Sequence, residues 1–273
     1  MSPLRRDGKM RTQSERAENV KPNLLRNLTN NALKPGFLPV MIGKVLGRLD
    51  LRRAAAARAA RSWCEQVAEP LEAFALGLDA ALWAEATAYQ AAFGPDAAAK
   101  LEALGIDLGG GGDSRLLYFL ARLTRPTVAV ETGVAAGHST AALLMALRAN
   151  SSGHLWSSDF PYFRLHDPER YVGVLVEEHL RERWTLFLDG DRKNLPRIAA
   201  SVPHIDLLHY DSDKSSPGRA RALKSLASRM TAKTVVVMDD IQDNLFFRTY
   251  AERQVRRWRV FASANKFVGL VGL

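Results

Sequence analysis

The chain has 273 residues, of which 47% are hydrophobic and 25% are charged, and this composition is typical of a globular protein with one sizeable domain and an extension. The only cysteine, Cys64, excludes a disulfide framework and a cysteine-based zinc site, and it favours a reducing compartment. The sequence has no run of about 18 uncharged apolar residues. Its first residues lack the apolar region of a secretory signal. We therefore expect a cytoplasmic protein without a membrane-spanning helix.

The net charge of +9 is concentrated at the N-terminus. Residues 1–61 contain 14 basic and 4 acidic residues, whereas the remainder contains 24 basic and 25 acidic residues. Because the body is nearly neutral, a nucleic-acid substrate is disfavoured. The apolar segment at residues 37–51 carries interspersed basic residues. It is expected to dock on the protein itself or on a second copy in a homo-oligomer. The alternative is peripheral contact with an anionic membrane surface.

The chain divides into three predicted regions. Residues 1–35 are polar and basic, and we expect a flexible arm. Residues 36–125 are predicted to be helical, with breaks near Pro70 and at Gly94–Pro95. This region is expected to supply docking, acceptor or oligomer contacts. Residues 126–273 are predicted to form the catalytic domain.

Strands and helices alternate regularly from Thr127 onward. The predicted strands are Thr127–Thr132, His154–Asp159, Trp184–Leu188, Ile205–Tyr210, Thr234–Met238, Arg259–Ala262 and Phe267–Val271. The predicted helices lie near 138–149, 169–182, 193–201, 217–229 and 245–257. The pattern predicts an α/β fold with a doubly wound, mostly parallel, seven-stranded Rossmann-like sheet, a helical N-terminal extension and a terminal hairpin.

The first predicted strand ends in a glycine turn that contains a carboxylate. Glu131 precedes Gly133 and Gly137, and Ser139 then begins a helix-forming run. A carboxylate disfavours a pyrophosphate at this turn, whereas it suits a ligand with a cationic amino acid and a ribose, such as S-adenosylmethionine. The dinucleotide pattern G-x-G-x-x-G is not met. An ordinary strand-to-helix turn remains the alternative.

Acidic residues also follow the other parallel strands, whose carboxyl ends meet at one edge of such a sheet. Asp159 is placed to hold ribose hydroxyls, and Gly190 and Asp191 are expected to flank the base. For any single aspartate, helix capping or solvation is the alternative explanation.

Asp211, Asp239 and Asp240 form a predicted acidic cluster after the fourth and fifth strands. Close carboxylates repel one another unless they are separated, protonated or bridged by a cation. An all-oxygen set of ligands suits a divalent ion, with Mg²⁺ as the first expectation. Lys214 lies three residues beyond Asp211. It could neutralise the cluster as a salt-bridge partner or act as a general base with a lowered pKa.

From residue 128 to the C-terminus the sequence resembles the class I S-adenosylmethionine-dependent methyltransferases. The segment Glu131-Thr-Gly-Val-Ala-Ala-Gly-His-Ser139 is similar to the first motif of the metal-dependent catechol and caffeoyl-CoA O-methyltransferases. Asp211-Ser-Asp-Lys214 resembles their D-x-x-K motif, and Asp239-Asp240 resembles their acidic pair. The metal-dependent sugar O-methyltransferases of macrolide pathways are also similar, with His in the place of Lys214. The N-terminal extension matches neither group.

The resemblance implies roles for these residues. The donor site would comprise Glu131, Gly133, Gly137, Ser139, Asp159, Gly190, Asp191 and Asp211. In it, Ser139 would contact the methionine carboxylate and Glu131 the amino-acid end. The metal would be held by Asp211, Asp239 and Asp240, and catalysis would use Lys214 as base together with Asp211.

The leading hypothesis is a metal-dependent O-methyltransferase for a small hydroxylated acceptor such as a sugar, glycolipid or natural product. The alternatives are a metal-independent N- or O-methyltransferase and an inactive donor-binding scaffold.

Overall fold

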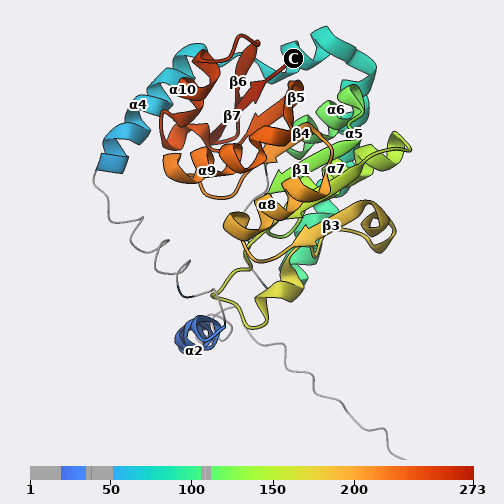
Figure 1. Cartoon of the computed structure of the whole chain (residues 1–273). Helices are drawn as coiled ribbons and strands as arrows, with labels where there is room; N and C mark the ends of the chain where they lie inside the picture. The colour runs from blue at the N-terminus through green and yellow to red at the C-terminus, as the bar shows by residue number, and fades with distance from the viewer. Residues whose placement is uncertain (1–19, 35–37, 39–51, 106–107, 109–111) are drawn as a thin grey trace, which may run out of the picture. The chain divides into compact units, whose positions relative to one another are not determined.

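The computed structural model describes residues 20–34, 38, 52–105, 108 and 112–273 (Figure 1). The chain divides into two compact units, and each is treated separately below. The first comprises residues 1–49 and 162–168, and the second comprises residues 50–161 and 169–273. The predicted apolar segment at residues 37–51 lies outside the described residues, apart from Leu38.

The second unit is built on one seven-stranded sheet with strand order β3-β2-β1-β4-β5-β7-β6. Strands β1 to β5 run parallel, and β7 lies antiparallel between β5 and β6. Their bounds are β1 Val128–Thr132, β2 His154–Ser158, β3 Trp184–Phe187, β4 Ile205–Tyr210, β5 Met230–Met238, β6 Trp258–Ser263 and β7 Lys266–Val271. The prediction of a mostly parallel, doubly wound sheet with a terminal hairpin is confirmed.

Helices cover both faces of the sheet (Figure 1). Their bounds are α4 Arg52–Val67, α5 Leu71–Leu104, α6 Ser114–Thr124, α7 His138–Ala149, α8 Asp191–Ser201, α9 Ser216–Leu226 and α10 Phe246–Glu252. One buried cluster joins the sheet to α5, α6 and α7, and a second joins its other face to α4, α8, α9 and α10. Successive residues of a strand pack into opposite clusters: Ala129 belongs to the first and Val128 to the second. The central strands β1, β4 and β5 therefore contribute buried apolar side chains to both faces of the sheet.

The helices that precede the sheet depart from the predicted breaks. The break near Pro70 is confirmed, because α4 ends at Val67 and α5 begins at Leu71. The break at Gly94–Pro95 is wrong, because α5 continues through Pro95. The helix is interrupted instead at Asp79, whose backbone is extended and whose carboxylate accepts a hydrogen bond from the Leu82 amide at 2.9 Å. Asp79 thus acts as an N-cap in the middle of the helix.

The predicted helix at residues 169–182 is wrong. This segment contains two short 3₁₀ helices, Pro168–Tyr171 and Glu178–Arg183, joined by a turn. The amides of Gly173 and Leu175 donate hydrogen bonds at 2.9 Å to the carbonyls of Ala135 and Ala136 in the glycine turn after β1. These long-range bonds replace the intrahelical bonds that a continuous helix would need.

The first unit contains helix α2, Val20–Ala32, within the arm that we predicted to be flexible. Asn31 donates hydrogen bonds from its amide nitrogen to the carbonyls of Phe163 and Leu165, at 2.8 and 2.9 Å. Asn27 contacts the carbonyl of Arg164 at 3.2 Å. The helix is therefore fastened to the backbone of residues 163–165. Across the described residues, no helix is both long enough and apolar enough to cross a membrane.

Candidate active site

The adjacent strands β1, β4 and β5 place polar side chains on one face of the sheet, at its carboxyl edge. Leu207 of β4 and Val237 of β5 belong to the core under α5, α6 and α7. Side chains alternate along a strand, so His209 and Asp239, each two residues further on, share that face. Glu131 on β1 pairs with His209, and His209 pairs with Val237. The strand register therefore places Glu131 and His209 side by side, and Asp239 follows on the same face at the end of β5.

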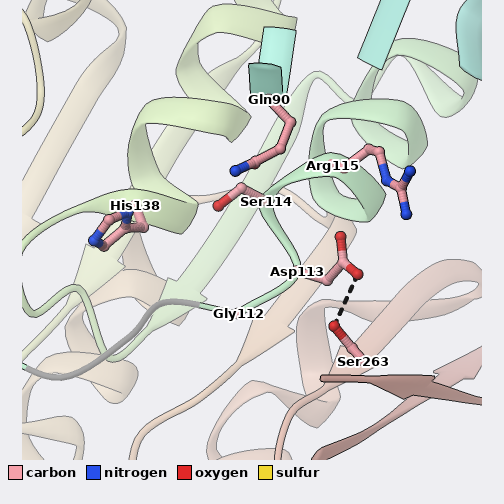
Figure 2. Close-up of a pocket in the computed structure, with 7 residues that line it drawn as sticks. All are labelled: Gln90, Gly112, Asp113, Ser114, Arg115, His138 and Ser263. Carbon is pink, nitrogen blue, oxygen red and sulfur yellow. Dashed lines mark hydrogen bonds between the residues drawn. The ribbon is translucent and has the colours of Figure 1, made fainter. Parts of the chain in front are cut away.

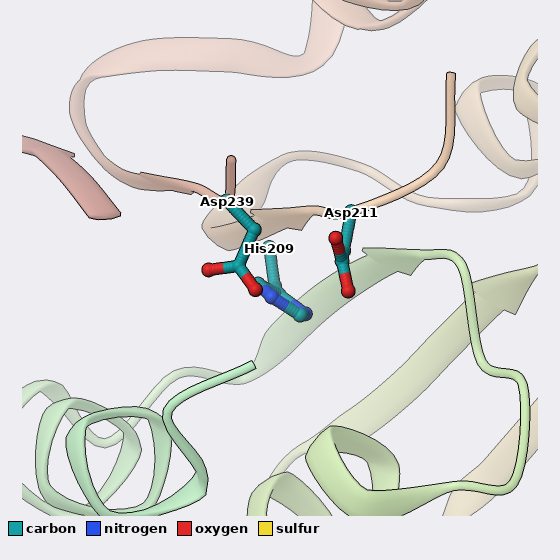
Figure 3. Close-up of side chains that lie close together, drawn as sticks. All are labelled: His209, Asp211 and Asp239. Carbon is teal, nitrogen blue, oxygen red and sulfur yellow. The ribbon is translucent and has the colours of Figure 1, made fainter. Parts of the chain in front are cut away.

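A cluster of three potential metal ligands results from this register. His209, Asp211 and Asp239 can each offer one ligand atom, and these atoms lie within 4.8 Å of one another (Figure 3). His209 is 0% exposed and Asp239 is 1% exposed. Within the described residues, neither ring nitrogen of His209 nor Oδ2 of Asp239 has a hydrogen-bond partner. Two carboxylates at this separation repel by about 3 kcal/mol at an effective dielectric near 20. These three side chains therefore fit a bound cation.

Glu131 is completely buried, and hydroxyl groups occupy both of its oxygens. Oε1 accepts a hydrogen bond from Ser139 at 2.6 Å, and Oε2 accepts from Thr140 at 2.7 Å and Ser157 at 2.9 Å. The predicted donor contacts of Glu131 and Ser139 stay predictions. To donate to the methionine carboxylate, the Ser139 hydroxyl would have to exchange its hydrogen bond to Glu131.

The glycine turn lies between β1 and α7. Gly133 has a φ of +83°, and a Cβ added to it would lie 2.6 Å from the carbonyl oxygen of Asp211, so only glycine fits there. Gly137 is the N-cap residue of α7. Asp159 reaches the turn from the end of β2, and its Oδ2 accepts hydrogen bonds from the amides of residues 134 and 135 at 3.2 and 2.7 Å. Asp159, which is predicted to bind the ribose, thus contacts the glycine turn that is predicted to bind the methyl donor.

Gly190 and Asp191, the predicted residues on the base side, lie next to Asp159. The Gly190 amide donates to the Asp159 carbonyl at 3.0 Å. Asp191 begins α8 and accepts hydrogen bonds from the hydroxyls of Ser158, at 2.7 Å, and Ser212. Its carboxylate therefore ties the end of β2 to the loop after β4.

Lys214 forms ion pairs with two of the predicted metal ligands, Asp211 and Asp240, and its Nζ lies 3.0 Å from Oδ2 of Asp240. Burial lowers the pKa of Lys214, and the charges of Asp240 and Asp239 oppose this effect. Burial alone would raise the pKa of Asp240, but Lys214 and Lys266 lower it overall. Lys214 therefore pairs with both Asp211 and Asp240, and the potential ligand atoms that lie close together are those of His209, Asp211 and Asp239.

Arg219 on α9 is a second residue that the sequence patterns did not single out. Its guanidinium is fully buried and donates to the carbonyls of Asp239 and Asp240 at 2.9 and 2.7 Å. Asn244 faces the same guanidinium at 3.4 Å and donates to the carbonyl of Lys214 at 2.7 Å. This network joins the loops that follow β4 and β5. The sequence signal for His209 was its place two residues before Asp211, whereas Arg219 had none.

A polar cavity of about 350 Å³ adjoins the cluster. It is lined by Gln90, Gly112, Asp113, Ser114, Arg115, His138 and Ser263 (Figure 2). A Cβ added to Gly112 would lie 2.6 Å from Oδ2 of Asp239, so Gly112 is a wall common to the cavity and the cluster. Oε1 of Gln90 is buried without a hydrogen-bond partner in the described part of the chain. The cavity therefore offers a ligand hydrogen-bonding groups rather than an apolar surface.

Residues 130–241 match the family model described as a methyltransferase domain. The match indicates a methyltransferase domain in this part of the chain, and it includes the glycine turn after β1 and the acidic residues that follow β4 and β5. A search of curated protein sequences gave no match.

Three solved structures are similar to this chain in fold. Cofactor-bound Rv0187 from MTB is 15% identical, with a TM-score of 0.54 over 66% of this chain and 88% of that chain. The O-methyltransferase TomG from Streptomyces achromogenes, involved in tomaymycin synthesis and solved with SAM, is 17% identical, with a TM-score of 0.51 over 66% and 89%. A methyltransferase from Geobacter sulfurreducens is 18% identical, with a TM-score of 0.50 over 66% and 88%.

Proposed function

We propose that the protein is an O-methyltransferase that uses a divalent cation and acts on a small hydroxylated acceptor such as a sugar, glycolipid or natural product. The observation that carries this proposal is the buried cluster of Asp211, Asp239 and His209, which lies beside the glycine turn and shares a wall with a polar cavity. The similarity in fold to the O-methyltransferase TomG supports oxygen as the methylated atom.

The donor would lie along the carboxyl edge of the sheet. Its amino-acid end would face the turn of Gly133 and Gly137, its ribose would face Asp159, and its base would lie towards Gly190 and Asp191. The parallel strands and the N-terminus of α7 favour such a ligand at this edge. A bound divalent cation would orient the acceptor oxygen and lower the pKa of its hydroxyl.

Lys214 would take the proton of the acceptor hydroxyl. Burial lowers its pKa, which increases the fraction of the neutral amine that a general base requires. Asp211 and Asp240 would hold the amine in place through their ion pairs. The acceptor oxygen would then attack the methyl carbon in line with the sulfonium, and S-adenosylhomocysteine would leave. Much of the acceleration would come from positioning.

The cavity is the proposed acceptor site. Figure 2 shows the amide of Gln90, the hydroxyl of Ser114 and the imidazole of His138, which come from three different helices. At the far side, the Ser263 hydroxyl donates to Asp113 at 2.9 Å. Groups of this kind suit an acceptor with several hydroxyls, because each buried polar group requires a partner.

A second candidate is methyl transfer to oxygen or nitrogen without a metal. The ion pairs of Lys214 with Asp211 and Asp240 favour it, because they neutralise part of the acidic cluster with a side chain of this protein. Sensitivity to EDTA distinguishes the two candidates. A small-molecule acceptor, homo-oligomer formation, peripheral membrane contact and a cytoplasmic location stay predictions from the sequence.

Calorimetric titration of S-adenosylhomocysteine, with Mg²⁺ and then with EDTA, tests the proposal. We expect binding in both conditions, and a separate heat of metal binding that is lost in Asp239→Asn. The matched control is Asp189→Asn, because Asp189 lies exposed after β3 and pairs with Arg197. A screen of hydroxylated sugars with labelled donor then seeks turnover. Donor binding without any metal heat would favour the second candidate, and no donor binding would refute the enzyme assignment.

A further inference from the structure

We propose that His209 is a ligand of the metal centre together with Asp211 and Asp239, so that the centre prefers a transition-metal ion such as Co²⁺, Mn²⁺ or Zn²⁺ to Mg²⁺. The inference rests on the proposed function, because it requires a divalent ion at the same cluster. The metal ligands would then be two carboxylates and an imidazole, in place of the three carboxylates that the sequence predicts.

The two nitrogens of His209 face different surroundings. Nδ1 lies 3.5 Å from Oε1 of Glu131. Nε2 lies on the side of Gly112, where an added Cβ would be 3.3 Å from Nε2 and 2.6 Å from Oδ2 of Asp239. Nε2 and this carboxylate oxygen therefore converge on the same point. Figure 3 shows the ring between the carboxylates of Asp211 and Asp239.

Glu131 holds the other edge of the ring. Three hydroxyls donate to its two carboxylate oxygens, so Glu131 cannot turn away without losing these bonds. A ring that carries its proton on Nδ1 presents that proton to Glu131 and leaves the lone pair of Nε2 free. A carboxylate behind a ligating imidazole is the usual outer support of a metal-binding histidine, where it fixes the tautomer and the ring orientation.

A purely structural role accounts less well for this histidine. A buried polar side chain ordinarily has hydrogen-bond partners. Within the described residues, both ring nitrogens of His209 lack one, although the ring is 0% exposed and Oδ2 of Asp239 beside it is also unpartnered. A metal ion would satisfy Nε2 of His209 and Oδ2 of Asp239 together, while Nδ1 faces Glu131 at 3.5 Å.

The imidazole decides which ion is favoured. Mg²⁺ prefers oxygen ligands and retains several waters, whereas imidazole nitrogen suits Zn²⁺ and other late transition metals. The contribution of His209 to selectivity is therefore measured as the change in the ratio of Co²⁺ to Mg²⁺ affinity when the imidazole is removed. The ratio in the wild type alone does not report it, since nearly any site of this kind binds Co²⁺ more tightly than Mg²⁺.

The experiment uses the metal-stripped full-length protein and two variants. His209→Gln removes the imidazole but keeps a polar side chain. The control, His204→Gln, alters a 43% exposed histidine just before the same strand. Co²⁺ is titrated by electronic absorption, Mg²⁺ competes for the site, and Mn²⁺ is examined by pulsed electron paramagnetic resonance for coupling to ¹⁴N.

We expect nitrogen coupling in the wild type and in His204→Gln, and its loss in His209→Gln. The ratio of Co²⁺ to Mg²⁺ affinity should fall at least tenfold in His209→Gln alone. Should His209→Gln fail to fold, the nitrogen signal of the wild type decides alone. Metal binding without nitrogen coupling would overturn the inference and leave the proposed function standing. Absence of metal binding would overturn both the inference and the metal-assisted reaction. Nitrogen coupling without binding of S-adenosylhomocysteine would support the inference and refute the proposed function.

Discussion

Replacing Arg219 by methionine removes the hydrogen bonds that hold the backbone just after β5. The side chain is fully buried, and its guanidinium donates to the carbonyls of Asp239 and Asp240 at 2.9 and 2.7 Å. Methionine fills similar space but donates no hydrogen bond. Each buried carbonyl left without a partner costs about 1–3 kcal/mol. Relief from burying a guanidinium offsets part of this cost, and burial already lowers the pKa of Arg219.

We expect Arg219→Met to lower the free energy of unfolding by about 3 kcal/mol, which corresponds to a decrease in Tm of about 6–12 °C for a chain of this size. Calorimetry and urea unfolding measure the change. The affinity of the cluster for Mn²⁺ should fall about tenfold as well, because outer-shell groups orient metal ligands. Arg221→Met is the control, since Arg221 is exposed on the same helix.

Two results would contradict this reasoning in different ways. A Tm within about 2 °C of the wild type would mean that the two carbonyls find other partners or that relief of burial cancels their cost. A lower Tm with unchanged Mn²⁺ affinity would make Arg219 a stabilising residue that does not position the ligands.

Three further outcomes follow from particular contacts. Gly112→Ala should weaken Mn²⁺ binding at least tenfold, because the added Cβ would lie 2.6 Å from a carboxylate oxygen of the cluster; Gly77→Ala, where space is open, should not, and equal effects would contradict the argument. Burial raises the pKa of Cys64 to about 12, so iodoacetamide at pH 8 should modify it only after unfolding, and rapid native labelling by mass spectrometry would refute this. A hydrogen bond from Arg122 lowers the pKa of Glu85, so the pair stabilises the fold above the ordinary pKa of 4.5 and this contribution is lost as the pH falls through the folded-state value. Glu85→Gln should therefore flatten the acid limb of the stability curve in urea unfolding, and an unchanged limb would exclude the pair as its cause.

The sheet was predictable because its pattern is local. Each parallel strand is a short apolar run bounded by turn residues, and the order of runs fixes the topology within narrow limits. The helix at residues 169–182 was predicted wrongly because the amides of Gly173 and Leu175 donate hydrogen bonds to the carbonyls of Ala135 and Ala136, far earlier in the chain. No local pattern contains such a partner.

The site was predictable as far as the strand ends determine it. Asp211 and Asp239 meet because the parallel strands β4 and β5 end at one edge. Asp240 diverges because its φ of +51° places it in the left-handed region, where the chain turns away towards Lys214. The place of His209 two residues before Asp211 puts both residues on one side of β4, but a single histidine in an apolar run resembles a core residue until the pairing with β1 and β5 is known.

The contact between Gly133 and Asp211 brings the glycine turn and the cation cluster into one mechanical unit. The space for a Cβ on Gly133 is filled by the carbonyl oxygen of Asp211, and the amide of Asp211 in turn bonds to the carbonyl of Thr132 at 2.9 Å. A bound molecule that shifts the glycine turn must therefore also shift Asp211, whose carboxylate is a proposed metal ligand.

In thermodynamic terms, occupancy of the two sites should be linked. If the cation alters the affinity for S-adenosylhomocysteine by some factor, the same factor must describe the effect of S-adenosylhomocysteine on the affinity for the cation. The two titrations, performed in either order, then describe one closed cycle, and the size of that factor measures how rigidly the main chain joins the strand ends.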